Sequence, residues 1–443
     1  MPAPLYEAIQ KYNKKAQARF HTPGHKGRAE APSPLQSVLP FDLTELPDTG
    51  SLFDGLGPTA EAEALAARLF GSAATLMSAG GCSLCIQTML RLAFPRGGKL
   101  ICGRILHRSA VHAMALLRID PLWVLPDTSA GTAFSGRITA EAVQEQLERH
   151  PDAGAVYLTS PDYCGMLSDI RAIAAAAAEY GVPVLVDCAQ GAHLKFLNDN
   201  LSPLSQGAAV SAESAHKTLP VLTGGAWLHL ARELPHAREA MALFASTSPS
   251  YFILLSLDLC RQWLEDTGGT PLRALAERTA SIKALLRDCG FVQPEGPCDP
   301  LRLAFSIEDA EAAGHFLREA GAEPEYAGAG TVILIPSAAN TEEDFQRLEQ
   351  GIQKLAASVS RNAPAIPPLY LPEQVLTPAQ AFLAETQRLP LAACLNRVAA
   401  AAHCPCPPGV PLVMPGERID AAALAQLEKY GVRELDVVKS AFI

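Results

Sequence analysis

The chain reads VPVLVD at Val182–Asp187 and, after a loop, AAVSAESAHK at Ala208–Lys217. The first run is continuously apolar up to its final carboxylate, which is typical of a parallel strand buried on both faces. The second run begins as another short apolar segment and ends at a lysine. Open α/β sheets bind ligands beyond the carboxyl ends of their strands, so we expect Asp187 and Lys217 at a functional edge.

Outward from these two runs, short apolar segments alternate with helical patterns. The pattern predicts strands at Ala74–Ser78, Lys99–Cys102, Leu122–Leu125, Ala155–Thr159, Val182–Asp187, Ala208–Ser211 and Ala226–Leu230. It predicts helices at Glu61–Phe70, Ser83–Ala93, Ser109–Arg118, Thr139–His150 and Asp169–Tyr180. Strands separated by helices predict an α/β fold with a large, mostly parallel sheet that helices cover on both faces.

A second, smaller α/β pattern follows a long helix predicted at Pro271–Cys289. Its predicted elements are Leu301–Ile307, Ala310–Ala320, Thr331–Ile335 and Glu342–Ala357, the last with a capping-box-like start at Thr341 and Asp344. The proline-rich residues 362–377 indicate a linker, and a last helix starts near Asp420. We therefore predict an N-terminal arm (1–45), a large domain (46–285), a small α/β domain (286–361) and a linker with a C-terminal module (362–443).

Composition narrows the class of protein. The 443 residues are 49% hydrophobic and 19% charged, which excludes a disordered chain, and a net charge of −10 gives no case for nucleic-acid binding. The odd number of cysteines, 11, fits thiols in a reducing compartment.

Metal binding and targeting are not indicated. Cys82-x-x-Cys85 and Cys404-x-Cys406 have no second pair of cysteine or histidine ligands at metal-binding spacing, so we expect no metal. No signal peptide or membrane span is visible, which predicts a cytoplasmic protein.

Lys217 and Asp187 suggest one particular chemistry. A lysine at a strand end, among small residues, can be desolvated and can form a Schiff base, although an isolated lysine is usually an ordinary surface residue. A carboxylate at the tip of a buried strand needs a partner, which can be a helix cap, a salt bridge or a protonated ring nitrogen. Enzymes that use pyridoxal 5'-phosphate (PLP) combine such a lysine with such a carboxylate.

A phosphate-binding turn is then expected. Gly80-Gly81 lies between a predicted strand and a predicted helix, where backbone amides and small residues favour phosphate. Ser214 and His216 could add donors, and so could the polar turn Thr247–Ser250, whose simpler role is a helix cap. His107 follows another predicted strand and could stack on a pyridine ring, although lone histidines are more often structural.

These segments resemble the Orn/Lys/Arg decarboxylase family of PLP enzymes, in its short wingless form, over nearly the whole chain. The resemblance rests on FHTPGHKG (Phe20–Gly27), DLTELPDTGSLFD (Asp42–Asp54), ILHRSAVHA (Ile105–Ala113), TSPDYCG (Thr159–Gly165), VLVDCAQGAH (Val184–His193), ESAHKTLPVLTGG (Glu213–Gly225), STSPSY (Ser246–Tyr251) and PPGVPLVMPGER (Pro407–Arg418). It implies a fold type I, aminotransferase-like architecture. It also implies a homodimer, or a higher homo-oligomer, with the site at the subunit interface.

The resemblance also implies roles for individual residues. Lys217 would be the Schiff-base lysine, Asp187 the partner of the pyridinium nitrogen, and His107 the residue stacked on the ring. The phosphate would be bound by Cys82, Ser83, Leu84, Ser214 and His216, with Ser248 serving the partner subunit's phosphate. The implied reaction is decarboxylation of arginine, lysine or ornithine to the amine and CO2, and arginine is preferred because short relatives are often biosynthetic.

Some positions depart from the family pattern. Gln190 stands where a histidine is usual, Cys406 where a tyrosine is expected, and Ala401 where an acidic residue is expected; Asp162 and Cys164 also differ. Two alternatives therefore stay open. One is another PLP reaction, either transamination or aldol cleavage. For transamination, Arg302 is the only obvious strand candidate to bind the α-carboxylate, although a structural role fits it better. The other is a catalytically weakened paralogue with a binding or regulatory role. No role is assigned to His21, His25 or Lys26.

Overall fold

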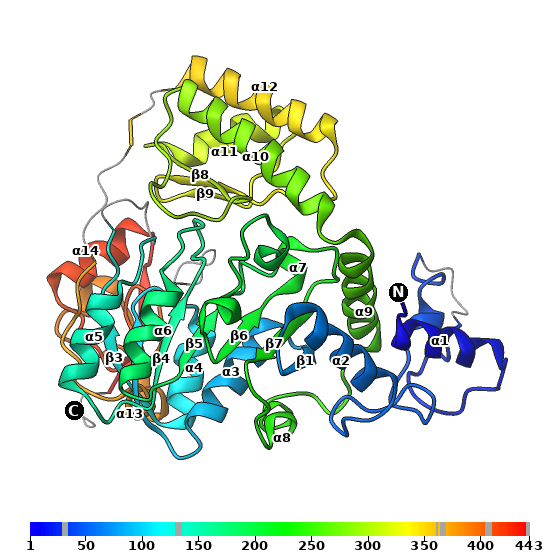
Figure 1. Ribbon diagram of the computed structural model, residues 1–443. Helices are drawn as coiled ribbons and strands as arrows, with labels where there is room; N and C mark the ends of the chain where they lie inside the picture. Colours follow the sequence, from blue (N-terminus) through cyan, green and yellow to red (C-terminus); the bar gives the residue numbers. More distant parts are fainter. Residues whose placement is uncertain (29–33, 129–134, 360–361, 364–368, 404–409, 440–443) are drawn as a thin grey trace. The chain divides into compact units, whose positions relative to one another are not determined.

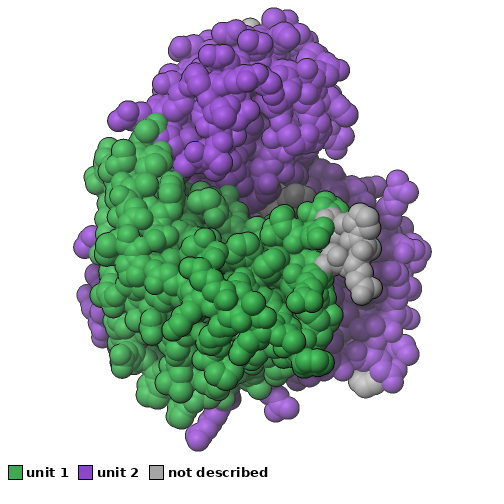
Figure 2. Space-filling model, turned by 90° about the vertical axis from the view of Figure 1, so that its right-hand side faces the viewer, with its two compact units in different colours: residues 1–92, 188–274 green, residues 93–187, 275–443 purple. Residues whose placement is uncertain are grey.

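The computed structural model describes residues 1–28, 34–128, 135–359, 362–363, 369–403 and 410–439 (Figure 1). The chain divides into two compact units, residues 1–92 with 188–274 and residues 93–187 with 275–443 (Figure 2). The four-part division predicted from the sequence stays a prediction, because these units cut the chain differently and do not test it.

The largest element of the described chain is a seven-stranded sheet of order β1-β7-β6-β5-β4-β2-β3. Its strands are β1 (Ala74–Ser78), β2 (Gly98–Gly103), β3 (Ile119–Val124), β4 (Ala155–Thr159), β5 (Val184–Asp187), β6 (Val210–Glu213) and β7 (Ala226–Leu230). The pairs β2–β3, β2–β4 and β4–β5 are parallel, whereas β7 runs antiparallel to both β1 and β6. The predicted α/β class with a mostly parallel sheet is confirmed.

Strand boundaries differ from the predictions where pairing extends a strand beyond its apolar run. The predicted strand at Ala208–Ser211 is β6, which continues to Glu213 because Ala212 and Glu213 pair with β7. The predicted strand at Leu122–Leu125 is β3, which starts at Ile119 because its whole length pairs with β2. Periodicity alone therefore located both strands but not their ends.

The first unit contains β1, β6 and β7 together with several helices. These helices are α1 (Pro4–Lys14), α2 (Pro58–Phe70), α3 (Gly81–Ala93), α7 (Ala215–Thr218), α8 (Ala237–Ala242) and α9 (Tyr251–Thr267), followed by α10 (Thr270–Asp288), which crosses into the second unit. The helix expected after the polar turn Thr247–Ser250 is α9, and the Ser250 hydroxyl caps it by accepting from the Ile253 N–H. Helix α1 buries Leu5 and Ile9, and the Leu5 N–H donates to Asp258 of α9.

The second unit holds three helices that follow its parallel strands and a separate small sheet. The helices are α4 (Arg108–Leu117), α5 (Ala140–Arg149) and α6 (Ile170–Glu179). The small sheet has the order β8-β10-β9, with β8 (Leu303–Ser306), β9 (Tyr326–Gly328), β10 (Thr331–Leu334), α11 (Ala310–Glu319) and α12 (Glu342–Ser358). Helix α12 starts at a complete capping box between Thr341 and Asp344, as predicted.

The C-terminal module, defined here as the described residues from 369 onward, completes the second unit. It contains α13 (Pro378–Leu383), β11 (Thr386–Pro390), α14 (Ala421–Lys429) and β12 (Glu434–Val438), and β11 pairs with β12 in a two-stranded sheet. Asp420 caps α14, which confirms the predicted start of the last helix. Short 3-10 turns occur at Leu39–Phe41, Leu194–Phe196, Pro203–Gln206 and Leu391–Ala393.

Candidate active site

The turn between β1 and α3 is fixed by its own glycines. Gly81 has a φ of +72°, and a Cβ on Gly80 would lie 3.0 Å from Leu84 Cδ2. The Gly80 N–H donates to Ser78 Oγ at 3.1 Å, and the Gly81 N–H donates to the Gly224 carbonyl at 2.8 Å. The first turn of α3 therefore starts in a fixed position, and its amides have no carbonyl of the same helix to bond.

A cavity of about 210 Å³ lies against this helix start. Its lining includes the predicted phosphate residues Ser83 and Leu84, together with Gly80, Ser246 and Ser248. The side chains of Ser83 and Ser248 are exposed, whereas Cys82 and Leu84 are buried. Hydroxyls and helix N-terminal amides form a donor set that suits a phosphate group. The structure thus brings Ser83 and Ser248 of one chain to one cavity.

Lys217 lies on the short helix α7, directly after β6. Its N–H donates to the Ser214 carbonyl at 3.1 Å, and the His216 N–H donates to the Gly225 carbonyl at 3.3 Å. Ser214 is buried, and Lys217 and His216 are half-buried. Burial lowers the pKa of the His216 imidazole, and the charge of Lys217 lowers it further. At neutral pH His216 is therefore expected to be uncharged.

Strand register explains why the turn after β1 and the turn after β6 belong to one edge. Ser78 at the end of β1 pairs with Ala226, and Glu213 at the end of β6 pairs with Trp227. Both strands run antiparallel to β7, so their carboxyl ends lie beside its first residues. The bond between Gly81 and Gly224 joins the two turns directly.

Asp187 ends β5 in the second unit, and its side chain is buried at 1% exposure. The Tyr157 hydroxyl on β4 donates to Asp187 Oδ2 at 3.2 Å. Sequence reasoning missed Tyr157, although it carries the single polar side-chain group in the interior of the run AVYLT before Thr159. Tyr157 therefore supplies one hydrogen-bond donor to this buried carboxylate.

His107 lies at the end of the loop between β2 and α4, where it is the N-cap residue of α4. Its Nδ1 accepts from the Ser109 N–H at 3.2 Å and contacts Ser109 Oγ at 2.8 Å. These two contacts fix the rotation of the imidazole ring. The predicted stacking role of His107 requires such a fixed ring, but stays a prediction.

The residues that depart from the family pattern differ in burial and in hydrogen bonding. Asp162 is buried and accepts from Ser135 Oγ at 2.6 Å and from the Gly136, Cys164 and Met166 amides at 2.9 Å, which makes it the centre of a turn. Burial raises the pKa of this carboxyl, and the four donors oppose that rise. Gln190 and Cys164 are also buried, and Ala401 is half-buried. Cys404 and Cys406 lie outside the described residues.

Arg302 and the polar residues of the N-terminal arm contact residues close to them in the structure. Arg302 is buried, and a Cβ on Gly165 would lie 2.6 Å from its Cβ, so this arginine packs tightly against the TSPDYCG turn. In the N-terminal arm, His21 Nε2 lies 2.5 Å from the Tyr12 hydroxyl and His25 Nε2 lies 3.1 Å from Asp42. Lys26 Nζ donates to the His21 carbonyl at 2.5 Å, so the arm motif is bonded to the arm itself.

Within the described ranges, the side chains of His, Cys, Asp and Glu form no cluster of three or more that could hold a metal ion. No helix in the same part of the chain is long and apolar enough to cross a membrane.

Comparisons with known proteins agree with the resemblance. The family model described as "Orn/Lys/Arg decarboxylase, major domain" matches residues 3–299, and the model of the C-terminal domain of the same family matches residues 365–430. The arginine decarboxylase of Bacillus subtilis is 30% identical, over 96% of this chain and 93% of the relative. The lysine decarboxylase LdcA of Pseudomonas aeruginosa is 22% identical, over 96% and 75%.

Among solved structures, the lysine decarboxylase LdcF of Francisella novicida has a TM-score of 0.82 at 20% identity, covering 99% of this chain and 81% of the other. A serine palmitoyltransferase of Sphingomonas wittichii has a TM-score of 0.55 at 16% identity, covering 70% and 79%. These likenesses show the fold, and the two family models together with the Bacillus relative show the family. The chain belongs to the Orn/Lys/Arg decarboxylase family.

Proposed function

We propose that the protein decarboxylates a basic amino acid with PLP as its cofactor. The observation that carries the proposal is the joined pair of turns in the first unit, where Lys217 follows β6 and the serine-lined cavity lies at the start of α3. Its donors suit a phosphate group, and its glycines leave room for close approach. The Asp187 carboxylate, buried beside the Tyr157 hydroxyl, is able to accept a hydrogen bond from a protonated ring nitrogen.

The proposed roles follow from these settings. The Lys217 amine would hold the cofactor aldehyde, Asp187 would keep the ring nitrogen protonated, and His107 would lie against the ring face. Ser83, Ser214, His216, Ser248 and the amides of Cys82–Leu84 would bind the phosphate. When bound, PLP supplies an electron sink for the pair released from the breaking C–C bond as CO2 leaves. Lys217 or a nearby histidine would then return a proton to the substrate carbon.

Among the substrates, we place arginine before lysine and ornithine. Relatives named arginine decarboxylase, from Bacillus subtilis, Bacillus cereus and Bacillus anthracis, are 28–30% identical over nearly the whole chain, whereas the named lysine decarboxylases are 22–24% identical. The preference follows the closer group of relatives.

Absorbance and product release test the function. Purified wild-type protein supplied with PLP is expected to absorb near the visible edge, and Lys217→Ala is expected to abolish that band. Lys195→Ala is the matched control, since Lys195 is the other lysine between residues 100 and 282 and is also half-buried. Incubation with arginine, lysine and ornithine in turn should release CO2 and the matching amine. A Lys217→Ala variant that keeps the band would overturn the cofactor assignment.

The same panel separates the alternatives. Formation of a keto acid without CO2 would favour transamination, and a bound cofactor with no reaction on any of the three substrates would favour the weakened paralogue.

We also propose a homodimer. The family resemblance assigns Ser248 to the partner subunit's phosphate, whereas the cavity that Ser248 shares with Ser83 favours the phosphate of its own chain. Mixing Lys217→Ala with Ser248→Ala subunits tests this. If Ser248 acts across the interface, each mixed dimer contains one site with both residues intact, and mixing restores activity. If Ser248 acts within its own chain, every site of the mixed dimer lacks one of the two residues, and activity stays at the level of the separate variants. Light scattering of the wild-type protein measures the subunit number.

A further inference from the structure

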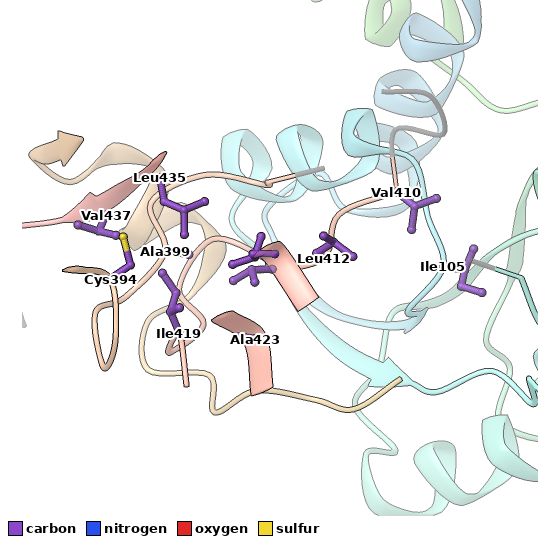
Figure 3. Close-up of a cluster of buried hydrophobic side chains, with 11 residues drawn as sticks. Ile105, Cys394, Ala399, Val410, Leu412, Ile419, Ala423, Leu435 and Val437 are labelled. Carbon is purple, nitrogen blue, oxygen red and sulfur yellow. The ribbon is translucent and has the colours of Figure 1, made fainter. Parts of the chain in front are cut away.

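The loop between β2 and α4, residues 104–107, is held by a part of the chain about 300 residues away. Ile105 is 6% exposed and belongs to the buried hydrophobic cluster of the C-terminal module. Figure 3 shows Ile105 at one end of this cluster, on the side of Val410 and Leu412. The hydrophobic core of the C-terminal module therefore includes Ile105, a side chain from the loop that follows β2 of the large sheet.

Arg104, the residue before Ile105, is held by the same module through charge. Its guanidinium donates to Glu417 Oε2 at 2.9 Å and to the Leu412 carbonyl at 3.3 Å, and the side chains of Arg104 and Glu417 are 3% and 0% exposed. The guanidinium also lies over the Trp123 ring, 5.0 Å from its centroid. Charges this deeply buried depend on each other, because neither can be rehydrated in place.

Glu417 is in turn fixed inside the module. Its Oε2 also accepts from the Met414 N–H at 2.8 Å, and its backbone carbonyl accepts from the Ala399 N–H at 2.9 Å. Burial raises the pKa of Glu417, and the charge of Arg104 opposes that rise, so the arginine helps to keep the carboxylate ionised. The ion pair thus joins the loop to the centre of the module.

The held segment leads directly to His107. The Arg104 N–H bonds the Val124 carbonyl of β3 at 2.9 Å, and three residues later the His107 ring bonds Ser109 of α4. Helix α4 also meets the module at a second place, where the rings of His112 and Phe382 lie 5.7 Å apart. Arg104 and Ile105 lie within three residues of His107 in this loop, so we expect a displacement of either residue to move the His107 backbone.

We propose that the C-terminal module acts as a positioning element for His107, with Glu417 as its positioning residue, working through Arg104 and Ile105. This inference rests on the proposed function, since it takes His107 to lie against the bound cofactor. It gives the module a role at the site without placing any of its own residues on the cofactor.

Glu417→Gln is the main test, because it removes the charge and keeps the shape. We expect kcat to fall about tenfold with little change in KM, since displacement of a group at a reacting centre affects the rate more than ground-state binding. We also expect the visible circular dichroism of the bound cofactor to change. Asp436→Asn is the matched control, because it breaks the exposed ion pair with Arg388 in the same module and should leave both signals within about twofold.

Ile105→Val is a second variant that tests the same inference if the Glu417→Gln protein does not fold. It removes one methylene from the same contact and should change the dichroism in the same direction, with a fall in kcat of about twofold. Folded variants of both positions with wild-type dichroism and wild-type kcat would overturn the inference.

A cycle with His107→Ala separates positioning from general destabilisation. If Glu417 acts through His107, Glu417→Gln lowers kcat in the wild-type background and has no further effect in the His107→Ala background. An equal loss in both backgrounds overturns the inference. A wild-type protein that never gains the visible band overturns the proposed function itself. A wild-type protein that binds PLP and releases CO2, beside a Glu417→Gln variant that matches it, overturns the positioning role alone.

Discussion

Two strand-to-helix connections carry proposed cofactor residues, and they are stabilised in opposite ways. The turn between β1 and α3 is set mainly by adjacent residues, because the Ser78 hydroxyl accepts from the Gly80 N–H and donates to the Gly81 carbonyl, with one added bond from Gly81 to Gly224. The loop between β2 and α4 is set by Glu417 and by the hydrophobic cluster of the C-terminal module. The first can be recognised in a single sequence segment, whereas the second becomes visible only when distant segments are packed together.

The largest expected effect is on the second connection. Arg104→Met leaves the Glu417 carboxylate buried without its cation, which should cost about 3–5 kcal/mol of unfolding free energy. Replacing both residues by methionine should recover most of that loss, because no unpaired charge remains in the interior. Urea denaturation measures both values.

Arg388→Met is the control for this prediction. Its exposed pair with Asp436 should be worth less than about 1 kcal/mol. A loss for Arg104→Met as small as that for Arg388→Met would show that the loop does not depend on the buried pair.

The first connection should respond to a smaller, local change. Gly81→Ala places a Cβ at a φ of +72°, and Gly181→Ala does the same at +67° after α6; neither new Cβ has a heavy atom closer than 4.0 Å. Each should cost about 1–2 kcal/mol of stability through the left-handed backbone. Only Gly81→Ala should also weaken PLP binding, by about tenfold or ~1.4 kcal/mol.

Titration of PLP into the cofactor-free protein, followed by absorbance, measures this difference. Equal PLP affinities in the two glycine variants would remove the β1–α3 turn from the proposed phosphate site.

The smallest expected effect concerns the pH dependence of stability at His216. Its pKa is lowered by burial and then by Lys217, so the unfolded chain binds the proton more readily than the folded protein does. The contribution of neutral His216 to the free energy of unfolding is therefore complete above the pKa of histidine in the unfolded chain, about 6.5. It is lost as the pH falls below that value.

His216→Gln should reduce the fall in Tm between about pH 7.5 and pH 5.5. His236→Gln is the control, since the His236 side chain is exposed. An unchanged slope in His216→Gln would show that this histidine gains its proton equally well in the folded protein.

The sequence predicted the sheet class and most of its elements for identifiable reasons. The runs Ala155–Thr159 and Ala226–Leu230 are apolar between polar segments, and the observed strands have the same bounds. The antiparallel direction of β7 was not predicted, because apolar periodicity is identical for either direction. Tyr157 was missed for a related reason, since an aromatic residue in a buried strand is ordinarily part of the core.

The sequence by itself determined the alternation of strands and helices, the glycine turn before α3, and the family motifs that single out Lys217 and Asp187. These are properties of short segments, where backbone preference and side-chain periodicity act between near neighbours. Only the tertiary structure decided that Glu417 pairs with Arg104 across 313 residues and that Ser83 shares a cavity with Ser248. A buried charge or a cavity wall is completed by whichever side chain packing brings to it, and no local pattern records that choice.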